Sequence, residues 1–275
     1  MPSNYGYCIL CINWYSVLIV QIATWNVNSI RARVDLVAAW LADQCPDVCC
    51  LQETKCTDAD FPFETFEEIG YQVAHHGLSH WNGVAIMSRV GLRKIFRGFH
   101  GHQEEPFNEA RSISAECGGV RVWSIYAPNG RALDDPHYLF KLVWLERLRG
   151  DLIATRAAKS STVVVGDFNV APSDLDIYDP RRWKSRTHAS APERAAIEAL
   201  LELGFFDLAR EWDGEDPFYT WWNYRSKLDD DKGLRIDLAL GSEEVFQRIK
   251  AVSVDRMARR AERPSDHAPL IVELY

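Results

Sequence analysis

Apolar and polar positions alternate in short blocks along most of the 275-residue chain. Alternation with a period of two, or a short apolar run between turn residues, predicts a strand, whereas apolar positions three and four apart predict a helix. These patterns predict helices at residues 31–43, 135–159 and 192–204, and strands at residues 21–28, 46–53, 83–89, 112–128 (a hairpin), 161–169, 219–224, 235–242, 249–256 and 267–274. Strands dominate both halves and each half carries a long helix, which predicts an α/β fold of two packed β-sheets with helices outside them.

The N-terminal segment differs from the rest, because the first thirty residues contain no charged side chain. A secretory signal would begin with basic residues, and a membrane span needs about 20 predominantly apolar residues. Residues 5–20 lack a basic start and are interrupted by Asn13 and Ser16, so membrane anchoring is disfavoured. We therefore expect the native start near Val20, with residues 1–19 an artefact of the assigned start or a disordered tail, and residues 20–275 one domain.

The composition indicates a folded cytoplasmic protein. Hydrophobic residues make up 47% of the chain, which is enough for a large core. The net charge of −8 disfavours a protein that coats nucleic acid non-specifically, yet it suits an enzyme that acts on phosphates through metal-binding carboxylates. The seven cysteines include Cys8 and Cys11 in a lone C-x-x-C, with no second pair to complete a zinc site. Reduced, mostly buried thiols are therefore expected.

Polar side chains recur at the ends of the predicted strands. They are Asn26 and Asn28, Gln52 and Glu53, Tyr126 and Asn129, Asp167 and Asn169, and Asp266 and His267. Asp237 lies inside an apolar run, where an unpaired carboxylate is strongly destabilising, so it needs a partner, and His267 is the natural candidate. Rigid scaffolds commonly display catalytic groups at strand ends. If these ends converge, they form one acidic pocket rich in amides.

Such a pocket has the chemistry for metal-assisted hydrolysis of a phosphodiester. A hard divalent cation, above all Mg²⁺, prefers carboxylate oxygens, and Glu53 is the best candidate ligand. His267, oriented by Asp237, would lie near the phosphate. Asp167 would act as the base that activates water.

Three further side chains, Asn26, Asn169 and Tyr126, would hydrogen-bond the phosphate oxygens as negative charge builds up. Taken singly, some of these residues also have ordinary structural interpretations: Asp167 as a turn residue, Asn169 as a cap and His267 as a buried core histidine. The signatures of zinc metalloproteases, P-loop NTPases and serine esterases are absent from the sequence. The whole set therefore favours phosphodiester hydrolysis.

Six motifs occur in order between residues 20 and 275: WNVNSIRAR, LQETK, YAPNG, GDFNVAPSDLDI, YRSK…DDDKGLRIDLAL and PSDHAPL. Together they resemble the exonuclease III family of abasic-site DNA repair nucleases, within the exonuclease–endonuclease–phosphatase superfamily. The resemblance implies a four-layer α/β sandwich of the DNase I type, with two packed mixed β-sheets flanked by helices. It also implies Mg²⁺-dependent cleavage 5′ to abasic sites, with Mn²⁺ able to substitute, and 3′-repair phosphodiesterase and 3′→5′ exonuclease activity in base excision repair.

The expected partner is double-stranded DNA with abasic sites or blocked 3′ ends. We expect a monomer with no stable protein partner, associated with the nucleoid only through its DNA substrate. The resemblance places the metal site on Asn26, Glu53, Asp167, Asn169 and Asp266. It places the catalytic groups on Tyr126, Asp167, Asn169, Asp237 and His267. The identity of the base, the number of metal ions and the ratio of endonuclease to exonuclease activity stay open.

Specificity for DNA is expected to lie around this site. Trp221, Leu234 and Ile236 match a small apolar wall that packs against an abasic deoxyribose, although Leu234 is equally compatible with plain core. Trp183, in the basic stretch RRWKSR, would wedge at the lesion or simply pack, and phosphate contacts are expected from residues 31–33, 181–186 and 224–227. The full set expected to contact DNA or the abasic pocket is Asn28, Lys55, Arg111, Arg131, Trp183, Trp221, Leu234 and Ile236.

Two other classes of function stay open on sequence alone. Another hydrolase of the superfamily, acting on a phosphoinositide or a sphingolipid, would share the metal site but lack the motif with the Trp221 pocket. A non-catalytic DNA-binding or membrane-tethered scaffold has no need of Glu53, Asp167, Asp237 and His267, which are all present.

Overall fold

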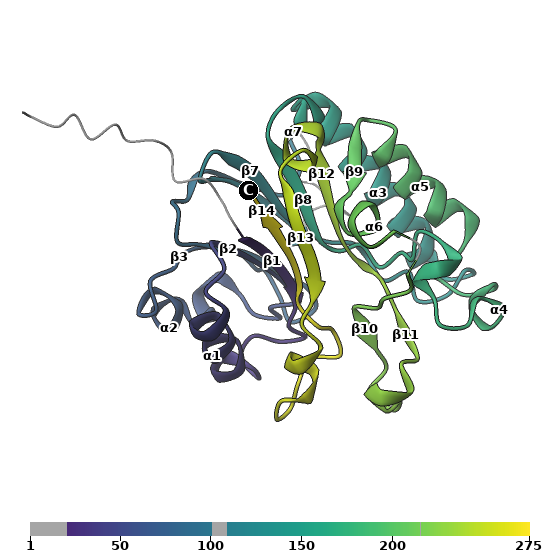
Figure 1. Cartoon of the computed structure of the whole chain (residues 1–275), viewed down its shortest axis with the longest axis horizontal. Coiled ribbons are helices and arrows are strands. Elements are labelled where there is room, and N and C mark those ends of the chain that lie inside the picture. The colour runs from purple at the N-terminus through teal and green to yellow at the C-terminus, as the bar shows by residue number, and fades with distance from the viewer. Residues whose placement is uncertain (1–20, 101–108, 215) are drawn as a thin grey trace, which may run out of the picture.

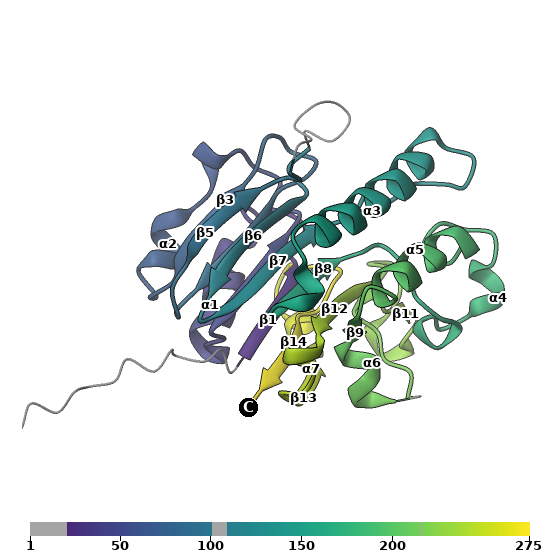
Figure 2. The same cartoon turned by 90° about the horizontal axis from the view of Figure 1, so that it is seen from above.

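Two β-sheets face each other and helices cover the outer side of each in the computed structural model, which describes residues 21–100, 109–214 and 216–275 (Figure 1). Helices α1 (Val34–Gln44) and α2 (Phe63–Glu67) flank the first sheet. Helices α3 (Pro136–Ala154) and α5 (Ala191–Leu201) lie side by side on the second (Figure 2). The predicted four-layer α/β sandwich is therefore confirmed.

The first sheet combines the N-terminal strands with the last two strands of the chain, in the order β13-β14-β1-β2-β4-β3. Its members are β1 (Gln21–Asn26), β2 (Val48–Gln52), β3 (Gln72–His76), β4 (Val84–Ser88), β13 (Ile249–Val254) and β14 (Leu270–Leu274). β1 and β2 are parallel, and the other neighbours are antiparallel. The pairing of β14 with β1 brings the two ends of the fold together.

The second sheet has the order β5-β6-β7-β8-β12-β9. Its members are β5 (Arg93–Arg97), β6 (Ser112–Cys117), β7 (Val120–Tyr126), β8 (Thr162–Asp167), β9 (Phe205–Asp207) and β12 (Asp237–Ser242). Its parallel pair is β7 and β8. At Gly166 of β8, φ is 145° and a Cβ would lie 2.0 Å from the carbonyl oxygen of Ile125, so glycine permits this close pairing.

Three apolar cores join the layers. The core between the sheets contains inward-facing strand residues such as Val122, Val165 and Leu270. Helix α1 buries Val37, Trp40 and Leu41 against the first sheet. Helices α3 and α5 bury residues including Trp144, Leu148 and Ile197 against the second. Fully burying such a side chain contributes about 1.5–3 kcal/mol, so these faces explain why the helices dock where they do.

The remaining elements are short. Strands β10 (Trp221–Trp222) and β11 (Gly233–Leu234) form a separate two-stranded sheet. The short helices are α4 (Pro180–Trp183), α6 (Leu208–Asp213) and α7 (Glu243–Phe246). The 3₁₀ turns are η1 (Asp58–Asp60), η2 (Ala157–Lys159), η3 (Asp174–Asp176), η4 (Leu228–Asp230) and η5 (Arg256–Arg260).

Some predicted boundaries were wrong. The strand expected at residues 219–224 is only two residues long, and the strand expected from residue 235 begins at Asp237. Helix α3 ends at Ala154 rather than at residue 159, because Arg156 adopts a left-handed conformation with φ of 53°. Strands β3, β5 and β9 were missed, and in β5 most side chains are exposed, so the alternation that marks a strand is absent.

The N-terminal extension, with Cys8 and Cys11, lies outside the described residues. Within residues 21–100, 109–214 and 216–275, no helix combines the length and the apolar character needed to cross a bilayer. The cysteines in this part of the chain are free, and all are buried except Cys45.

Candidate active site

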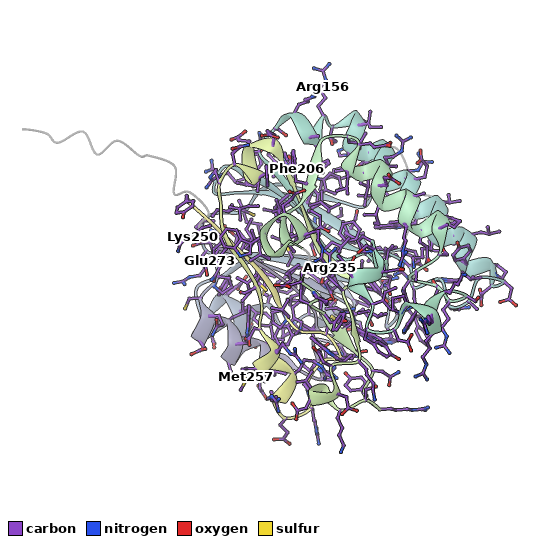
Figure 3. All side chains as sticks on the ribbon, turned by 45° about the vertical axis from the view of Figure 1, so that its right-hand side comes forward. Arg156, Phe206, Arg235, Lys250, Met257 and Glu273 are labelled. Carbon is purple, nitrogen blue, oxygen red and sulfur yellow. The ribbon has the colours of Figure 1, made fainter. Side chains whose placement is uncertain are left out.

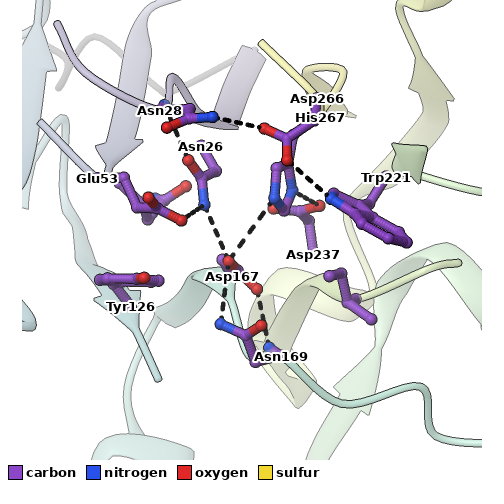
Figure 4. Close-up of polar contacts among 12 residues, drawn as sticks. Asn26, Asn28, Glu53, Tyr126, Asp167, Asn169, Trp221, Asp237, Asp266 and His267 are labelled. Atoms are coloured by element: carbon purple, nitrogen blue, oxygen red, sulfur yellow. Dashed lines mark hydrogen bonds and ion pairs between the residues drawn. The ribbon is translucent and has the colours of Figure 1, made fainter. Parts of the chain in front are cut away.

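The polar residues at the strand ends meet at one edge of the two sheets (Figure 4). The parallel register of β1 and β2 brings Asn26 beside the residue that precedes Glu53. The parallel register of β7 and β8 aligns Tyr126 with Asp167, and the antiparallel pairing of β12 with β8 places Asp237 opposite Asp167. Strand register therefore gathers, in one place, residues that are far apart in the sequence.

Several turns at this edge have an uncommon backbone conformation. The angle φ is 45° at Asn28, 52° at Glu53, 53° at Lys55, 56° at Arg131 and 54° at Asn169. Non-glycine residues rarely adopt positive φ, and such residues concentrate at functional sites, where the surrounding structure holds them in place. Positive φ also occurs away from this edge, at Cys45, Lys94 and Arg156, so it accompanies the polar side chains here without being confined to them.

His267 and Asp237 form a buried pair. Nδ1 of His267 lies 2.8 Å from Oδ2 of Asp237, and both side chains are almost inaccessible. Burial alone would lower the pKa of His267, but the carboxylates of Asp237 and Asp167 outweigh it and raise that pKa to about 10. The arrangement thus favours a charged imidazole, whose second nitrogen lies 3.9 Å from Oδ2 of Asp167.

Asp167 lies at the centre of the site. Its Oδ1 accepts a hydrogen bond from the backbone N–H of Asn169 at 2.8 Å, and its Oδ2 accepts from Nδ2 of Asn26 at 2.9 Å and Nδ2 of Asn169 at 3.1 Å. Burial, reinforced by the carboxylates of Asp237 and Glu53, nevertheless raises the pKa of Asp167 to about 7. A carboxyl group with such a pKa exchanges protons close to neutral pH.

Glu53 lies next to Asp167, and the amide of Asn26 bridges the two carboxylates. Nδ2 of Asn26 donates to Oε1 of Glu53 at 2.8 Å, and Nζ of Lys55 lies 2.8 Å from Oε2. Lys55 also donates to Oδ1 of Asn28 at 2.5 Å. The side chain of Glu53 is therefore oriented from two directions.

Tyr126 closes the floor of the site. Burial, together with the nearby carboxylate of Glu53, raises the pKa of its hydroxyl well above the usual range. The guanidinium of Arg111 lies over its ring, 4.6 Å from the ring centroid. Arg111 was expected among the DNA contacts, but it is only 5% exposed and is paired with Glu109, so its observed contacts are with the protein.

Asp266 is held on the far side of the site. Nε1 of Trp221 donates to its Oδ2 at 3.0 Å, and Nδ2 of Asn28 donates to its Oδ1 at 3.1 Å. Burial would raise the pKa of Asp266, but the charge of His267 and the hydrogen bond from Trp221 outweigh burial and lower that pKa.

The apolar wall expected to contact an abasic sugar is largely buried inside the protein. Leu234 and Ile236 are 0% and 2% exposed and belong to a small apolar cluster. The half-buried rings of Trp183 and Trp221 pack against this cluster and meet edge to face, with centroids 6.4 Å apart. The two indoles are therefore the accessible part of this wall.

A groove of about 600 Å³ adjoins the indole of Trp183. Its lining includes Arg131, Trp183, Arg186 and His188. Arg131 is exposed, with Asp135 3.9 Å away. Two of the residues expected to contact DNA, Arg131 and Trp183, thus line the same groove.

Sequence reasoning missed a buried ion pair behind the site. Lys141 and Glu193, both 0% exposed, are in direct contact. Nζ of Lys141 also donates to the backbone oxygens of Asn169 at 2.6 Å and Asn129 at 3.3 Å, and Glu193 accepts from the backbone N–H of His188 at 2.9 Å. The pair thus fixes the loops that carry the site, and a lysine on the apolar face of α3 was the signal that the sequence offered.

A carboxylate oxygen of Glu53, one of Asp167 and a ring nitrogen of His267 lie within 4.8 Å of one another. Because a charged imidazole cannot ligate a cation, the two carboxylates are the candidate ligands. Carboxylate oxygens are the donors that hard divalent cations prefer. Oδ1 of Asp237 is buried and has no hydrogen-bond partner among the described residues, which leaves an unsatisfied acceptor beside the group. The residues present therefore fit a divalent cation.

The other residues expected at the metal have different contacts. Asn26 and Asn169 direct their amide nitrogens at Asp167, and their amide oxygens already accept hydrogen bonds. Both oxygens of Asp266 accept hydrogen bonds from neighbouring side chains. In this arrangement these three residues orient the site around the carboxylates of Glu53 and Asp167.

Fold and site together define a class of protein, the α/β-sandwich hydrolases that act on phosphate esters. Residues 23–267 match the Endonuclease/Exonuclease/phosphatase family, and the chain belongs to this family.

Individual relatives narrow the class. The exodeoxyribonuclease III of Haemophilus influenzae is 33% identical over 266 residues, which cover 92% of this chain and 99% of that protein. An AP endonuclease from Archaeoglobus fulgidus superimposes with a TM-score of 0.90 at 38% identity, covering 93% of this chain and 99% of the other. A 3′ phosphatase from Neisseria, bound to a product DNA hairpin, gives a TM-score of 0.89 at 38% identity with the same coverage. The family and enzyme class expected from the sequence, a DNA repair nuclease of the exonuclease III type, are confirmed.

Proposed function

We propose that this protein uses Mg²⁺ to cleave duplex DNA 5′ to abasic sites and to clear blocked 3′ ends, and that Mn²⁺ can replace Mg²⁺. The observation that carries the proposal is the position of Asp167 between the carboxylate of Glu53 and the His267–Asp237 pair. This arrangement combines ligands for a cation, a carboxyl group that titrates near neutral pH and a positive charge. Similarity to an exodeoxyribonuclease III, an AP endonuclease and a 3′ phosphatase supports the substrate class.

In this proposal Glu53 and Asp167 hold the cation, and Asn26, Asn169 and Asp266 complete its surroundings. A bound divalent cation supplies neutralisation of the charge that builds up on the phosphate. The orientation of Glu53 by Asn26 and Lys55 supports its part, because a ligand held before the cation arrives needs little reorganisation.

The remaining side chains act on the phosphate and on water. Asp167 takes the proton of the attacking water, with its Oδ2 oriented by the amides of Asn26 and Asn169. His267, kept charged by Asp237, donates a hydrogen bond to a phosphate oxygen. Tyr126 donates to another oxygen of the same phosphate. Asn169, whose amide nitrogen donates to Asp167 and to the backbone oxygen of Ala127, keeps Asp167 in place beside that phosphate.

The test uses a DNA duplex that carries one stable abasic analogue. Wild type and His267→Ala are compared in Mg²⁺ and in EDTA, with circular dichroism as the control for folding. We expect a single nick 5′ to the analogue, which requires Mg²⁺ and is lost in the variant. A folded wild type that leaves this duplex intact but hydrolyses a soluble inositol phosphate would instead support the rival superfamily hydrolase.

A second candidate function is processing of 3′ ends in preference to internal nicking. The closed wall at Leu234 and Ile236 favours it, because an internal abasic sugar must be extruded into a pocket, whereas a free 3′ end is not constrained by a continuing strand. The two candidates separate in the ratio of kcat/KM for a 3′-phosphate end and for an internal abasic analogue in otherwise identical duplexes. A ratio above about ten would favour 3′-end processing, since it corresponds to a transition-state difference of about 1.4 kcal/mol.

We further propose that residues 20–275 form the catalytic domain of a monomeric cytoplasmic enzyme and that residues 1–19 are dispensable. A chain that begins at Val20 should retain full activity and sediment as a monomer. Intact-mass analysis of the native protein tests the expected start, because a mass that includes residues 1–19 would contradict it.

A further inference from the structure

Tyr224 lies beside the candidate active site with its ring exposed and its hydroxyl fixed. It belongs to the connection between β10 and β11, and 52% of its surface is exposed. Its hydroxyl accepts from Nδ2 of Asn28 at 3.2 Å and Nη2 of Arg33 at 3.0 Å, and donates to the backbone oxygen of Pro264 at 3.1 Å. A tyrosine hydroxyl has one donor and two acceptor positions, so all are satisfied and the ring is held in one orientation.

Arg259 covers one face of this ring. Its guanidinium carbon lies 5.5 Å from the ring centroid. Arg259 is itself buried and donates to the backbone oxygens of Ser265 at 2.5 Å and Trp222 at 3.4 Å. The η5 turn that carries it lies at the surface of the molecule, where Met257 marks it in Figure 3. Even with this fixed cation over one face, 52% of the surface of Tyr224 stays exposed.

Short contacts join Tyr224 to the cluster of carboxylates. Nδ2 of Asn28, which donates to Tyr224, also donates to Oδ1 of Asp266 at 3.1 Å. Oδ1 of Asn28 accepts from Lys55, which is paired with Glu53. A nucleotide next to a phosphate bound at these carboxylates would therefore lie within reach of the exposed ring.

We propose that the open face of Tyr224 is a stacking platform for a nucleobase adjacent to the cleaved phosphodiester, an assignment that rests on the proposed DNA substrate. Aromatic rings stack on any base, because every base has a π-face, so the contact adds affinity without reading sequence. A ring that is already fixed loses little conformational entropy on binding. The exposed Arg225 and Lys227 of the same loop supply positive charge for the neighbouring phosphates.

The variants Tyr224→Phe and Tyr224→Leu separate the ring from its hydroxyl. Phenylalanine keeps the stacking face and removes the hydrogen bonds, whereas leucine keeps apolar volume and removes the aromatic plane. Tyr275→Leu is the matched control, because Tyr275 is 75% exposed and follows β14 at the end opposite His267. Each protein is assayed on duplexes with one abasic analogue and one 2-aminopurine at successive flanking positions, in EDTA for binding and in Mg²⁺ for cleavage.

We expect Tyr224→Leu to raise KM and Kd about tenfold while kcat stays within about twofold, a loss within the range for one base–aromatic stack. Tyr224→Phe and Tyr275→Leu should stay within about threefold of wild type. The fluorescence of 2-aminopurine at one flanking position should be quenched by wild type and Tyr224→Phe but not by Tyr224→Leu.

Two results would overturn the stacking role. In one, Tyr224→Leu keeps the KM and the quenching of wild type. In the other, Tyr224→Phe fails as badly as Tyr224→Leu, which would mean that the hydroxyl merely positions Asn28. Both presuppose that wild type nicks the duplex; a folded wild type that neither binds nor cleaves it in Mg²⁺ removes the proposed function as well.

Discussion

Oδ2 of Asp237 lies 2.8 Å from Nδ1 of His267, and this contact bridges the two sheets of the sandwich. Asp237 begins β12 of the second sheet, whereas His267 comes just before β14 of the first. Both are buried, so each charge depends on the other for compensation. The geometry of the site is therefore coupled to the packing of one sheet on the other.

The substitution Asp237→Asn should lower kcat by at least about 10²-fold, the lower end of the range for positioned acid–base groups. The substitution removes the carboxylate that contributes most to the raised pKa of His267. Asparagine is neutral, so it does not stabilise the charged imidazole in the same way. Single-turnover nicking of the abasic duplex measures the effect. The exposed Asp43 at the end of α1 provides the control Asp43→Asn, and equal rates for the two variants would contradict the assigned role.

The substitution Lys141→Met should lower the free energy of unfolding by about 3–5 kcal/mol, because it leaves the carboxylate of Glu193 buried without its cationic partner. The double variant Lys141→Met/Glu193→Gln removes that charge and keeps the capping box of α5, so it should recover part of the loss. Urea unfolding monitored by tryptophan fluorescence gives both values. A double variant less stable than Lys141→Met would show that the cost comes from packing rather than from the unpaired charge.

The substitution Gly166→Ala should destabilise the protein by about 2 kcal/mol or more, because the new Cβ would collide with the backbone of β7 at a φ that alanine rarely adopts. Gly150→Ala is the matched control, because nothing lies within 4 Å of a Cβ at that position of α3. Removing glycine from a helix interior should stabilise by about 0.5–1 kcal/mol. Thermal unfolding of the two variants should therefore shift in opposite directions, and a shift in the same direction would disprove the account.

The stability of the fold should fall below pH 6.5 through His75. Burial lowers the pKa of His75 from 6.5 to about 4, although the carboxylate of Asp58 opposes the effect. Between these values the unfolded chain binds a proton that the folded chain excludes, so the contribution is present above pH 6.5 and is lost as the pH falls toward 4.

Between pH 7 and pH 5 this linkage lowers the free energy of unfolding by about 2 kcal/mol. Urea unfolding of wild type and His75→Gln at both pH values isolates the contribution of this one histidine from those of the others. Parallel losses in the two proteins would mean that His75 does not carry it.

The sequence predicted the fold class and most of the strands because the alternation that buries one face of a strand is local. It predicted β2, β8 and β14 from short apolar stretches. Strand β5 was not predicted, because its side chains are mostly exposed. The family was recognised from six ordered motifs, and the family match over residues 23–267, together with the similarity to an exodeoxyribonuclease III, confirms it. Each motif could be recognised from the sequence because its residues lie close together along the chain.

The contacts within the candidate site depend on the tertiary structure. Polar residues at strand ends could be named from the sequence, but the strand order and register decided that Asp237 lies opposite Asp167 and that His267 returns beside β1. Packing between distant elements also decided that Leu234 is buried, that Arg111 stacks on the ring of Tyr126 and that Lys141 contacts Glu193. By itself the sequence determined which groups are available and which local elements carry them. Only the tertiary structure decided which atoms meet and which are shielded from water, because burial and pairing depend on segments that are far apart along the chain.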